Sequence, residues 1–159
     1  MSEVILITTS KQLGYVSVGS HPIGLMYIAS YLRDLDRHNV RIIDQKIKAL
    51  SESDLTTKLK KYQPKFIGIT GMTYELDAIC ALASMIKKTL PKVHIIIGGC
   101  HATSSPEDFI KFDFIDYVIC GEGEISFSEL IKSINHGFLY PKISGLAYKK
   151  NGHIIYNKI

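Results

Sequence analysis

Two stretches decide the fold class: VHIIIGGCHATS at residues 93–104 and DYVICGEGEISFSEL at residues 116–130. In each, a short apolar run (Val93–Ile97 and Tyr117–Cys120) is followed by glycine and then by residues suited to a helix. The runs are nearly continuous and do not alternate with polar residues, which is typical of strands with both faces buried. They therefore predict strand–turn–helix units of a parallel sheet covered on both sides.

The same alternation extends outward over most of the chain. Further strands are predicted at Val4–Ile7, Val40–Ile43 and Phe66–Ile69. Five helices are predicted: from Pro22, from Ser51 with Asp54 as capping-box partner, near Thr73, from Ser105 as N-cap, and through Phe127 and Ile134 to Gly137. The predicted fold is an α/β domain with a five-stranded parallel sheet and helices on both faces.

The first predicted helix and the chain's end add two further expectations. Leu25, Ile28, Leu32 and Leu35 recur every three or four residues and predict one buried stripe. Near the end, Ile143–Tyr148 and His153–Tyr156 flank Asn151-Gly152, a strong hairpin signal, and this C-terminal hairpin is expected to pack beside the α/β unit. We assign residues 1–140 to the α/β domain and 141–159 to the hairpin and the start of a linker.

Composition excludes several classes of protein. The 159 residues are 46% hydrophobic and 21% charged, enough for one well-packed domain. No apolar run approaches the ~20 residues of a membrane span, and no secretory signal is visible, so a cytoplasmic protein is expected. The net charge of +4 is too diffuse for a nucleic-acid surface, with Lys58, Lys60 and Lys61 as its densest cluster. Three cysteines without a CxxC pair indicate neither a disulfide framework nor a zinc site.

The strand-to-helix turns carry the unusual polar residues and most of the glycines. Open parallel sheets bind ligands beyond the carboxyl ends of their strands, where these turns lie. The turns are Thr8–His21, Thr70–Thr73, Gly98–His101 and Gly121–Glu124. Glycine admits a ligand close to the backbone, and helix N-termini offer free N–H donors. Several such turns on one edge predict a broad ligand site.

Specific residues argue against the functions most common among α/β domains. Gly14 and Gly19 have the spacing of a phosphate loop, but Ser20-His21 replaces its Lys-Ser/Thr pair. A GxGxxG dinucleotide fingerprint does not follow the first strand. Gly68-Ile69-Thr70 lacks the aspartate of a phospho-accepting receiver domain, and the adjacent Cys100-His101 is poorly placed to act as nucleophile and base.

The same residues resemble a known family. HPIGLMYIA (21–29), IGGCHAT (97–103) and DYVICGEGE (116–124) are similar to segments of the cobalamin-binding domains that precede radical SAM catalytic domains. The likeness continues through residues 42–44, 67–70 and the closing hairpin, and so covers nearly the whole chain in order.

This resemblance implies a flavodoxin-like sheet that binds cobalamin above its carboxyl edge, with the lower nucleotide tail among the strands. Gly98 and Gly99 would make space for the tail, and threonine hydroxyls or the amides at 121–124 would bind its polar groups. The cofactor-binding residues expected on this basis are Thr70, Gly71, Met72, Thr73, Gly98, Gly99, Cys100, His101, Thr103, Gly121, Glu122, Gly123 and Glu124. Glu122 and Glu124 have an equally good alternative role at the positive end of the last helix.

The chain also departs from cobalamin-domain motifs. Domains that ligate cobalt through histidine use Asp-x-His-x-x-Gly, whereas GSHPIG (19–24) has glycine in place of the aspartate. His21 is therefore expected to cap a helix or line the pocket. For His101, a structural hydrogen bond is as good an account as a role in the pocket. Cobalt without a protein histidine ligand is the favoured interpretation, and the resemblance implies the same.

The CxxxCxxC motif of radical SAM enzymes is absent from these residues. We expect a C-terminal radical SAM domain in cis, carrying S-adenosylmethionine and a [4Fe-4S] cluster. By itself, this chain would then contain no catalytic machinery. The alternative is a degenerate docking or oligomerisation domain without cofactor.

Overall fold

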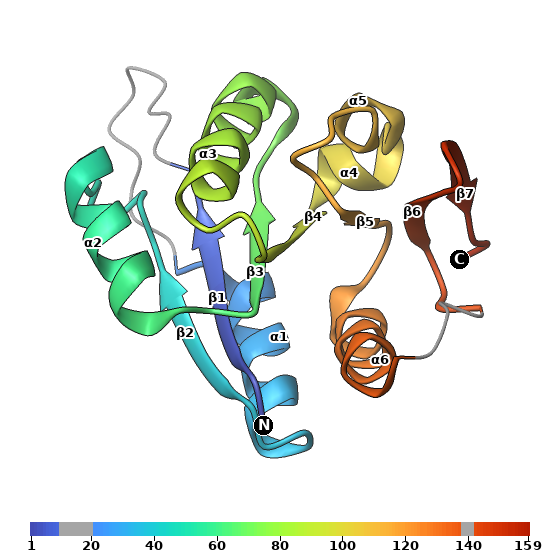
Figure 1. Ribbon diagram of the computed structural model, residues 1–159, viewed down its shortest axis with the longest axis horizontal. Coiled ribbons are helices and arrows are strands. Elements are labelled where there is room, and N and C mark those ends of the chain that lie inside the picture. The colour runs from blue at the N-terminus through green and yellow to red at the C-terminus, as the bar shows by residue number, and fades with distance from the viewer. Residues whose placement is uncertain (10–20, 138–141) are drawn as a thin grey trace.

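The strands of this chain form one seven-stranded sheet in a computed structural model that describes residues 1–9, 21–137 and 142–159 (Figure 1). The strand order is β2-β1-β3-β4-β5-β6-β7. The strands are β1 (Glu3–Thr8), β2 (Asn39–Ile43), β3 (Phe66–Thr70), β4 (His94–Gly98), β5 (Tyr117–Ile119), β6 (Leu146–Lys150) and β7 (His153–Tyr156). β1 to β5 are parallel, which confirms the prediction from their apolar runs, and β6 and β7 are antiparallel.

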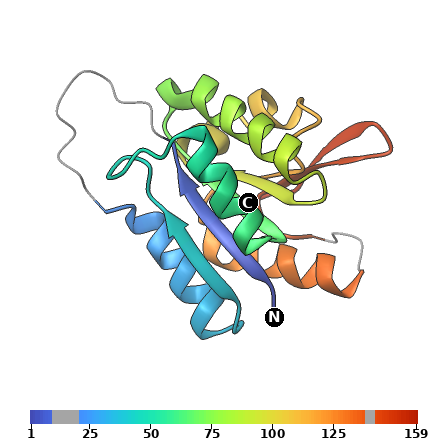
Figure 2. The ribbon, with the colours of Figure 1, turned by 60° about the vertical axis from the view of Figure 1, so that its left-hand side comes forward.

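Helices cover both faces of the sheet. α1 (Ile23–Asp34) and α6 (Gly123–His136) pack against each other on one face (Figure 2). The other face carries α2 (Glu52–Tyr62), α3 (Leu76–Thr89), α4 (Cys100–Ser104) and α5 (Glu107–Ile110), with a 3-10 turn, η1 (Thr73–Glu75), before α3. Alternate strand residues face the two helix layers, so Leu6 and Ile96 belong to one apolar core, and Ile7 and Ile97 to the other.

Several local signals are confirmed. The Ser51 hydroxyl accepts a hydrogen bond from the Asp54 N–H at 3.1 Å and caps α2, as the capping-box pattern predicts. Gly137 ends α6 in the left-handed conformation with φ 69°. Asn151 and Gly152 both have positive φ, 52° and 79°, as a two-residue hairpin turn requires.

Other expectations need correction. The hairpin does not pack beside the sheet but extends it, because β6 pairs with β5, so the sheet has seven strands and not five. Leu35 lies outside the buried stripe of α1, which is formed by Leu25, Ala29 and Leu32, and is 65% exposed. A short helix, α4, precedes the one expected after Ser105, and the N-cap of α5 is Pro106, without a side-chain cap.

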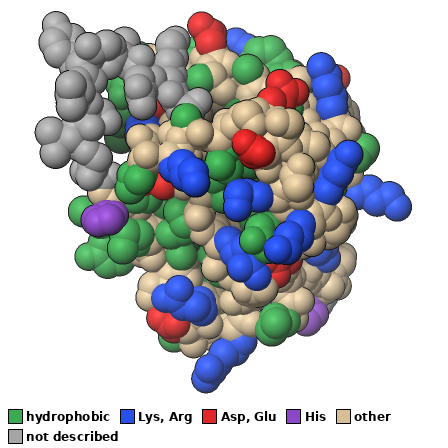
Figure 3. Space-filling model, turned by 90° about the vertical axis from the view of Figure 1, so that its left-hand side faces the viewer, with side chains coloured by type: hydrophobic (Ala, Val, Ile, Leu, Met, Phe, Trp, Pro, Cys, Tyr) green, Lys and Arg blue, Asp and Glu red, His purple; other side chains and the backbone are tan. Residues whose placement is uncertain are grey.

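The side of the molecule that carries β2 and α2 bears many Lys and Arg side chains (Figure 3). Lys58, Lys60 and Lys61 are exposed, and the last two lie in the final turn of α2, where a cation is favoured by the helix dipole. Arg41 pairs with Glu3 at 2.8 Å and stacks over the Tyr62 ring. The positive charge here therefore has a local structural role. Among the described residues, no helix is long and apolar enough to cross a bilayer.

Candidate functional site

A cavity of about 650 Å³ opens at the carboxyl edge of the sheet, between α1 and α6. Nine of the thirteen expected site residues line it: Thr70, Gly98, Gly99, Cys100, Thr103, Gly121, Glu122, Gly123 and Glu124. The structure therefore brings together the turns after β3, β4 and β5. This is the edge where parallel α/β sheets bind ligands.

The strand register arranges the floor of the cavity in two rows. Thr70 and Gly98 lie beside one another in β3 and β4, line the cavity and form the row nearest the edge. One step deeper on the same face, Leu6, Gly68 and Ile96 form the second row, and all three line the cavity. The floor therefore changes from polar or small at the edge to apolar inside.

Gly98 keeps the floor open. A Cβ atom built on Gly98 would have the carbonyl oxygen of Ile119 as its nearest neighbour, at 3.9 Å. Nothing in the described protein therefore fills the space above this residue, and any longer side chain there would extend over the cavity floor. This is the small-residue gap expected for a ligand that inserts among the strands.

Gly99 has a different role, although it also lines the cavity. Its φ is 102°, and a Cβ atom would lie 2.6 Å from the Thr70 hydroxyl oxygen and 3.0 Å from the carbonyl oxygen of Gly71. The expectation that Gly99 clears space for the ligand is therefore only part of the account. Gly99 is also required for close packing of the turns after β3 and β4.

Thr103 links two turns of the rim. Its hydroxyl donates to the carbonyl oxygen of Gly99 at 3.0 Å and accepts from the N–H of Gly121 at 3.0 Å. The hydroxyl and this amide were both expected to be available to a ligand, but they bind each other. Thr70, Glu122, Glu124 and the first turn of α6 remain as the polar groups of the mouth.

Four expected site residues lie outside the cavity lining: Gly71, Met72, Thr73 and His101. His101 is buried on the opposite face of the sheet, with its ring edge-on to Phe109 and its Nε2 at 3.2 Å from an Asp108 carboxylate oxygen. Its role is structural, because α4 turns the side chain away from the cavity. Met72 and Thr73 are exposed at the start of η1.

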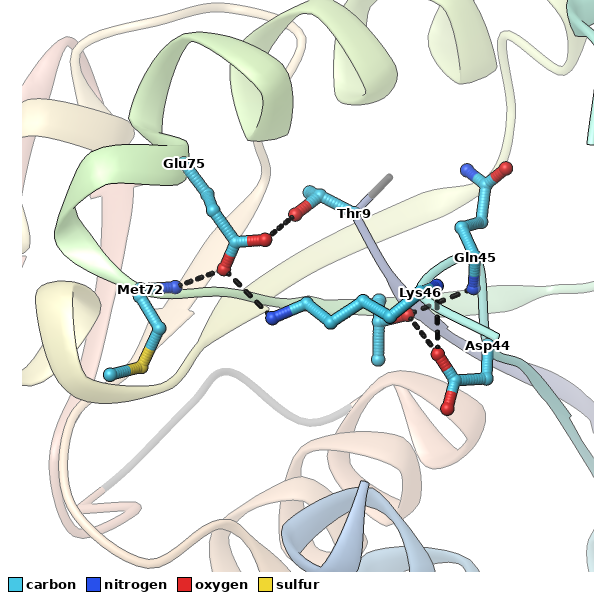
Figure 4. A network of polar contacts seen from close by, with 7 residues as sticks. Thr9, Asp44, Gln45, Lys46, Met72 and Glu75 are labelled. Carbon is cyan, nitrogen blue, oxygen red and sulfur yellow. Dashed lines mark hydrogen bonds and ion pairs between the residues drawn. The ribbon is translucent and has the colours of Figure 1, made fainter. Parts of the chain in front are cut away.

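The turn after β3 is held by a buried carboxylate, that of Glu75, which is 0% exposed (Figure 4). Glu75 accepts hydrogen bonds from the Met72 N–H at 2.7 Å and the Thr9 hydroxyl, and pairs with the Lys46 ammonium at 3.1 Å. These donors come from three segments, so Glu75 joins the ends of β1, β2 and β3. One of its oxygens would lie 3.1 Å from a Cβ atom on Gly71, the residue that packs against Gly99. Glu75 thus supports the rim from behind.

The cysteines at this edge differ in exposure. Cys100 lines the cavity and is exposed. Cys120 lies outside the lining, its thiol 3.3 Å from the carbonyl oxygen of Ala102, and burial raises the pKa of this thiol above its usual value of 9.0. Cys120 is therefore held as a neutral packing thiol.

No metal ligand set is visible in the described part of the chain, where no group of three His, Cys, Asp or Glu side chains converges. His21 is exposed and does not line the cavity. Residues 10–20 of the first long turn, including Gly14, Gly19 and Ser20, lie outside the described residues.

The deeper lining was not anticipated from the sequence. It consists of Leu6, Leu25, Ile28, Gly68, Ile69, Ile96, Ile119 and Phe127, with Pro22, Ile23 and Gly24 at the start of α1. Alternation along the strands gives the signal that could have found part of it: Ile96 shares a face with Gly98, and Gly68 with Thr70. In the sequence these residues cannot be distinguished from core residues, because they are of the apolar types that form a core.

Comparison with known proteins assigns the family. Residues 13–131 match the family model of the B12 binding domain. An "uncharacterized methyltransferase" of Pyrococcus horikoshii is 37% identical over 134 residues, which are 84% of this chain and 29% of that protein. The chain therefore belongs to the B12-binding domain family, and its cofactor is cobalamin.

Solved structures show the same fold. The radical S-adenosylmethionine methyltransferase TsrM of Kitasatospora setae superposes with a TM-score of 0.83 at 18% identity, over 99% of this chain and 30% of TsrM. The cobalamin-dependent S-adenosylmethionine radical enzyme OxsB, solved with aqua-cobalamin, gives 0.81 at 20% identity, over 99% of this chain and 22% of OxsB. The chain thus resembles the cobalamin module of such enzymes and spans less than a third of their length. The alternative of a docking domain without cofactor is not favoured.

Proposed function

We propose that this chain binds cobalamin with the nucleotide tail in the cavity between α1 and α6 and the corrin ring on the rim above it. The observation that carries this proposal is the open space over Gly98, at the mouth of a cavity whose floor is the sheet itself. The residues fit such a ligand, because a narrow slot suits a tail and a rim of small residues suits a flat ring.

The proposed contacts are those that the structure places at the mouth. Thr70 and the N-terminal amides of α6 would bind polar groups of the tail, since a helix N-terminus attracts anionic groups such as a phosphate. Gly98 and Gly99 would leave space for the tail to enter the cavity. Thr103 would act indirectly, by joining the turns after β4 and β5. Glu124 lies in the first turn of α6, where a carboxylate also stabilises the helix.

We propose further that the module serves a radical SAM domain in the same polypeptide, with the segment after the β6–β7 hairpin, at the end of residues 141–159, leading toward it. The names of the relatives support this: TsrM and OxsB are radical enzymes that use S-adenosylmethionine, and TsrM has been solved with cobalamin and a [4Fe-4S] cluster. Cobalamin supplies methyl-transfer or redox chemistry when bound. The residues described here would bind and orient it, and S-adenosylmethionine and the cluster would belong to the partner domain.

The test is co-elution of hydroxocobalamin with the purified chain, followed by visible absorption during size exclusion. Gly98→Leu should abolish co-elution and leave the circular dichroism spectrum unchanged, because the new side chain enters open space. Thr57→Leu, which adds the same side chain to an exposed position of α2, is the matched control and should retain the cofactor. Retention by Gly98→Leu would refute the proposed slot, and failure of the folded wild-type chain to retain any corrinoid would refute the function.

A further inference from the structure

The cavity has a steep polarity gradient from mouth to interior. Its polar lining residues all lie on the rim: Thr70, Cys100, Thr103, Glu122 and Glu124. The interior is lined by Leu6, Leu25, Ile28, Gly68, Ile96, Ile119 and Phe127. A ligand group that passes the rim therefore finds no polar side chain among the described lining residues of the interior.

The interior is also tightly bounded. Leu6, Ile96, Ile119 and Phe127 are at most 3% exposed, although each contributes to the cavity wall. A Cβ atom on Gly68 would lie 2.8 Å from Leu6 Cδ2 and 3.2 Å from Phe127 Cε2. The missing side chain of Gly68 lets Leu6 and Phe127 pack close to the sheet, so that apolar side chains cover the floor of the interior.

The backbone of the floor offers no replacement for polar side chains. β1, β3 and β4 are central strands, paired on both sides through their registers, so their N–H and C=O groups bind each other. A polar group carried into the interior would lose its water without gaining a partner from this floor.

We infer that the interior selects corrinoids by their lower base, and accepts an apolar benzimidazole in preference to a purine. This inference rests on the proposed function, because it requires the tail to enter the cavity. Dimethylbenzimidazole carries two methyl groups and no exocyclic donor, so it loses little on transfer to apolar surroundings. Adenine carries an exocyclic amino group and additional ring nitrogens, which this interior leaves without partners.

Affinities for three corrinoids test the inference: cobalamin, the analogue with adenine as lower base, and cobinamide, which lacks the phosphate, ribose and base of the tail. Titration of the wild-type chain should give the tightest binding for cobalamin and binding weaker by ~10-fold or more for the adenine analogue, since a tenfold loss corresponds to ~1.4 kcal/mol. Cobinamide should also bind more weakly than cobalamin, because it leaves the apolar interior empty.

A pair of variants localises the effect. Ile96→Thr places a hydroxyl in the interior and should reduce the ratio of the affinities for cobalamin and the adenine analogue. Ile97→Thr makes the same change at the next position of β4, on the opposite face, and should leave this ratio as it is in the wild type. Because the comparison is a ratio within one variant, a loss of overall stability does not imitate the result.

Equal affinity for cobalamin and the adenine analogue would overturn the inference and leave the proposed function standing. Equal affinity for cobalamin and cobinamide would overturn both, because the tail would then contribute nothing to binding. Absence of binding for all three corrinoids would overturn the proposed function itself.

Discussion

At the scale of single residues, two adjacent glycines illustrate what a motif can and cannot reveal. Gly98 and Gly99 look equivalent in the sequence, and both were expected to make room for the cofactor. In the structure Gly98 faces open space, whereas Gly99 combines a φ of 102° with close contacts to Thr70 and Gly71. The proposed function therefore assigns the first glycine to the ligand, whereas the contacts of the second show that the fold requires it.

This difference predicts opposite effects of alanine. Gly99→Ala should lower the free energy of unfolding by about 1–3 kcal/mol, because a side chain is strained at this backbone conformation. Gly98→Ala should leave it unchanged or raise it by up to about 1 kcal/mol, because it restricts the unfolded chain without a clash. Urea denaturation followed by circular dichroism measures both. Similar losses for the two variants would contradict the assigned roles.

At the scale of elements, the parts predicted from the sequence are those that depend on local signals. The apolar runs, the Ser51 cap, the Gly137 end of α6 and the Asn151-Gly152 turn all have local causes, and each was found where expected. The pairing of β6 with β5 and the α4 helix were missed. They depend on which edge of the sheet is free and on the path of the chain between β4 and α5. Neither can be predicted from a short stretch of sequence, because both depend on contacts between distant residues.

The same distinction explains which residues of the candidate site could be predicted from the sequence. Turn residues at the carboxyl edge were predicted because topology alone brings them together. The apolar interior was missed because Ile96 and Phe127 cannot be told from core residues by type. In the sequence, Glu75 is only an acidic residue near the start of the helix predicted from about Thr73, but in the structure it is a fully buried link between three strand ends.

The buried carboxylate of Glu75 should contribute more to stability than the ammonium of Lys46 that pairs with it. Glu75→Ala should lower the free energy of unfolding by about 3 kcal/mol, because it leaves the Met72 N–H and the Thr9 hydroxyl without their buried partner. Lys46→Met removes only the ammonium, whose side chain is 33% exposed, and should cost less than Glu75→Ala, because the buried carboxylate loses its cation but keeps both hydrogen-bond donors. Chemical denaturation of the two variants tests the order. A larger loss for Lys46→Met would show that the carboxylate is not the centre of this network.

At the scale of the whole molecule, the edge opposite the cavity carries a buried histidine, His38, and a partly buried one, His94, and the two predict a dependence of stability on pH. Burial lowers the pKa of His38 and of His94 below the usual 6.5. The Nδ1 atom of His38 also accepts a hydrogen bond from the Ser2 N–H at 3.2 Å, which requires that nitrogen to be unprotonated. Both imidazoles are therefore favoured in the neutral form by folding.

The sign of the effect follows from proton binding. Below pH 6.5 the unfolded chain binds protons at these two positions more readily than the folded chain, so acid favours unfolding. The melting temperature should fall as the pH is lowered from about 6.5, and the double variant His38→Asn, His94→Asn should show a shallower fall over the same range. Scanning calorimetry at several pH values provides the measurement, and an unchanged slope in the double variant would assign the acid sensitivity to other groups.

The cavity that we propose as the cofactor site lies at the carboxyl edge of the sheet, and none of its described lining residues belongs to α2 or to the β6–β7 hairpin. Hydrogen–deuterium exchange of the chain with and without hydroxocobalamin should show slower exchange in peptides covering residues 98–104 and 121–127 when the cofactor is present. Peptides of α2 and of the β6–β7 hairpin should be unchanged. Cofactor-dependent protection confined to α2 or the hairpin, with none at the carboxyl edge, would contradict binding in the cavity between α1 and α6.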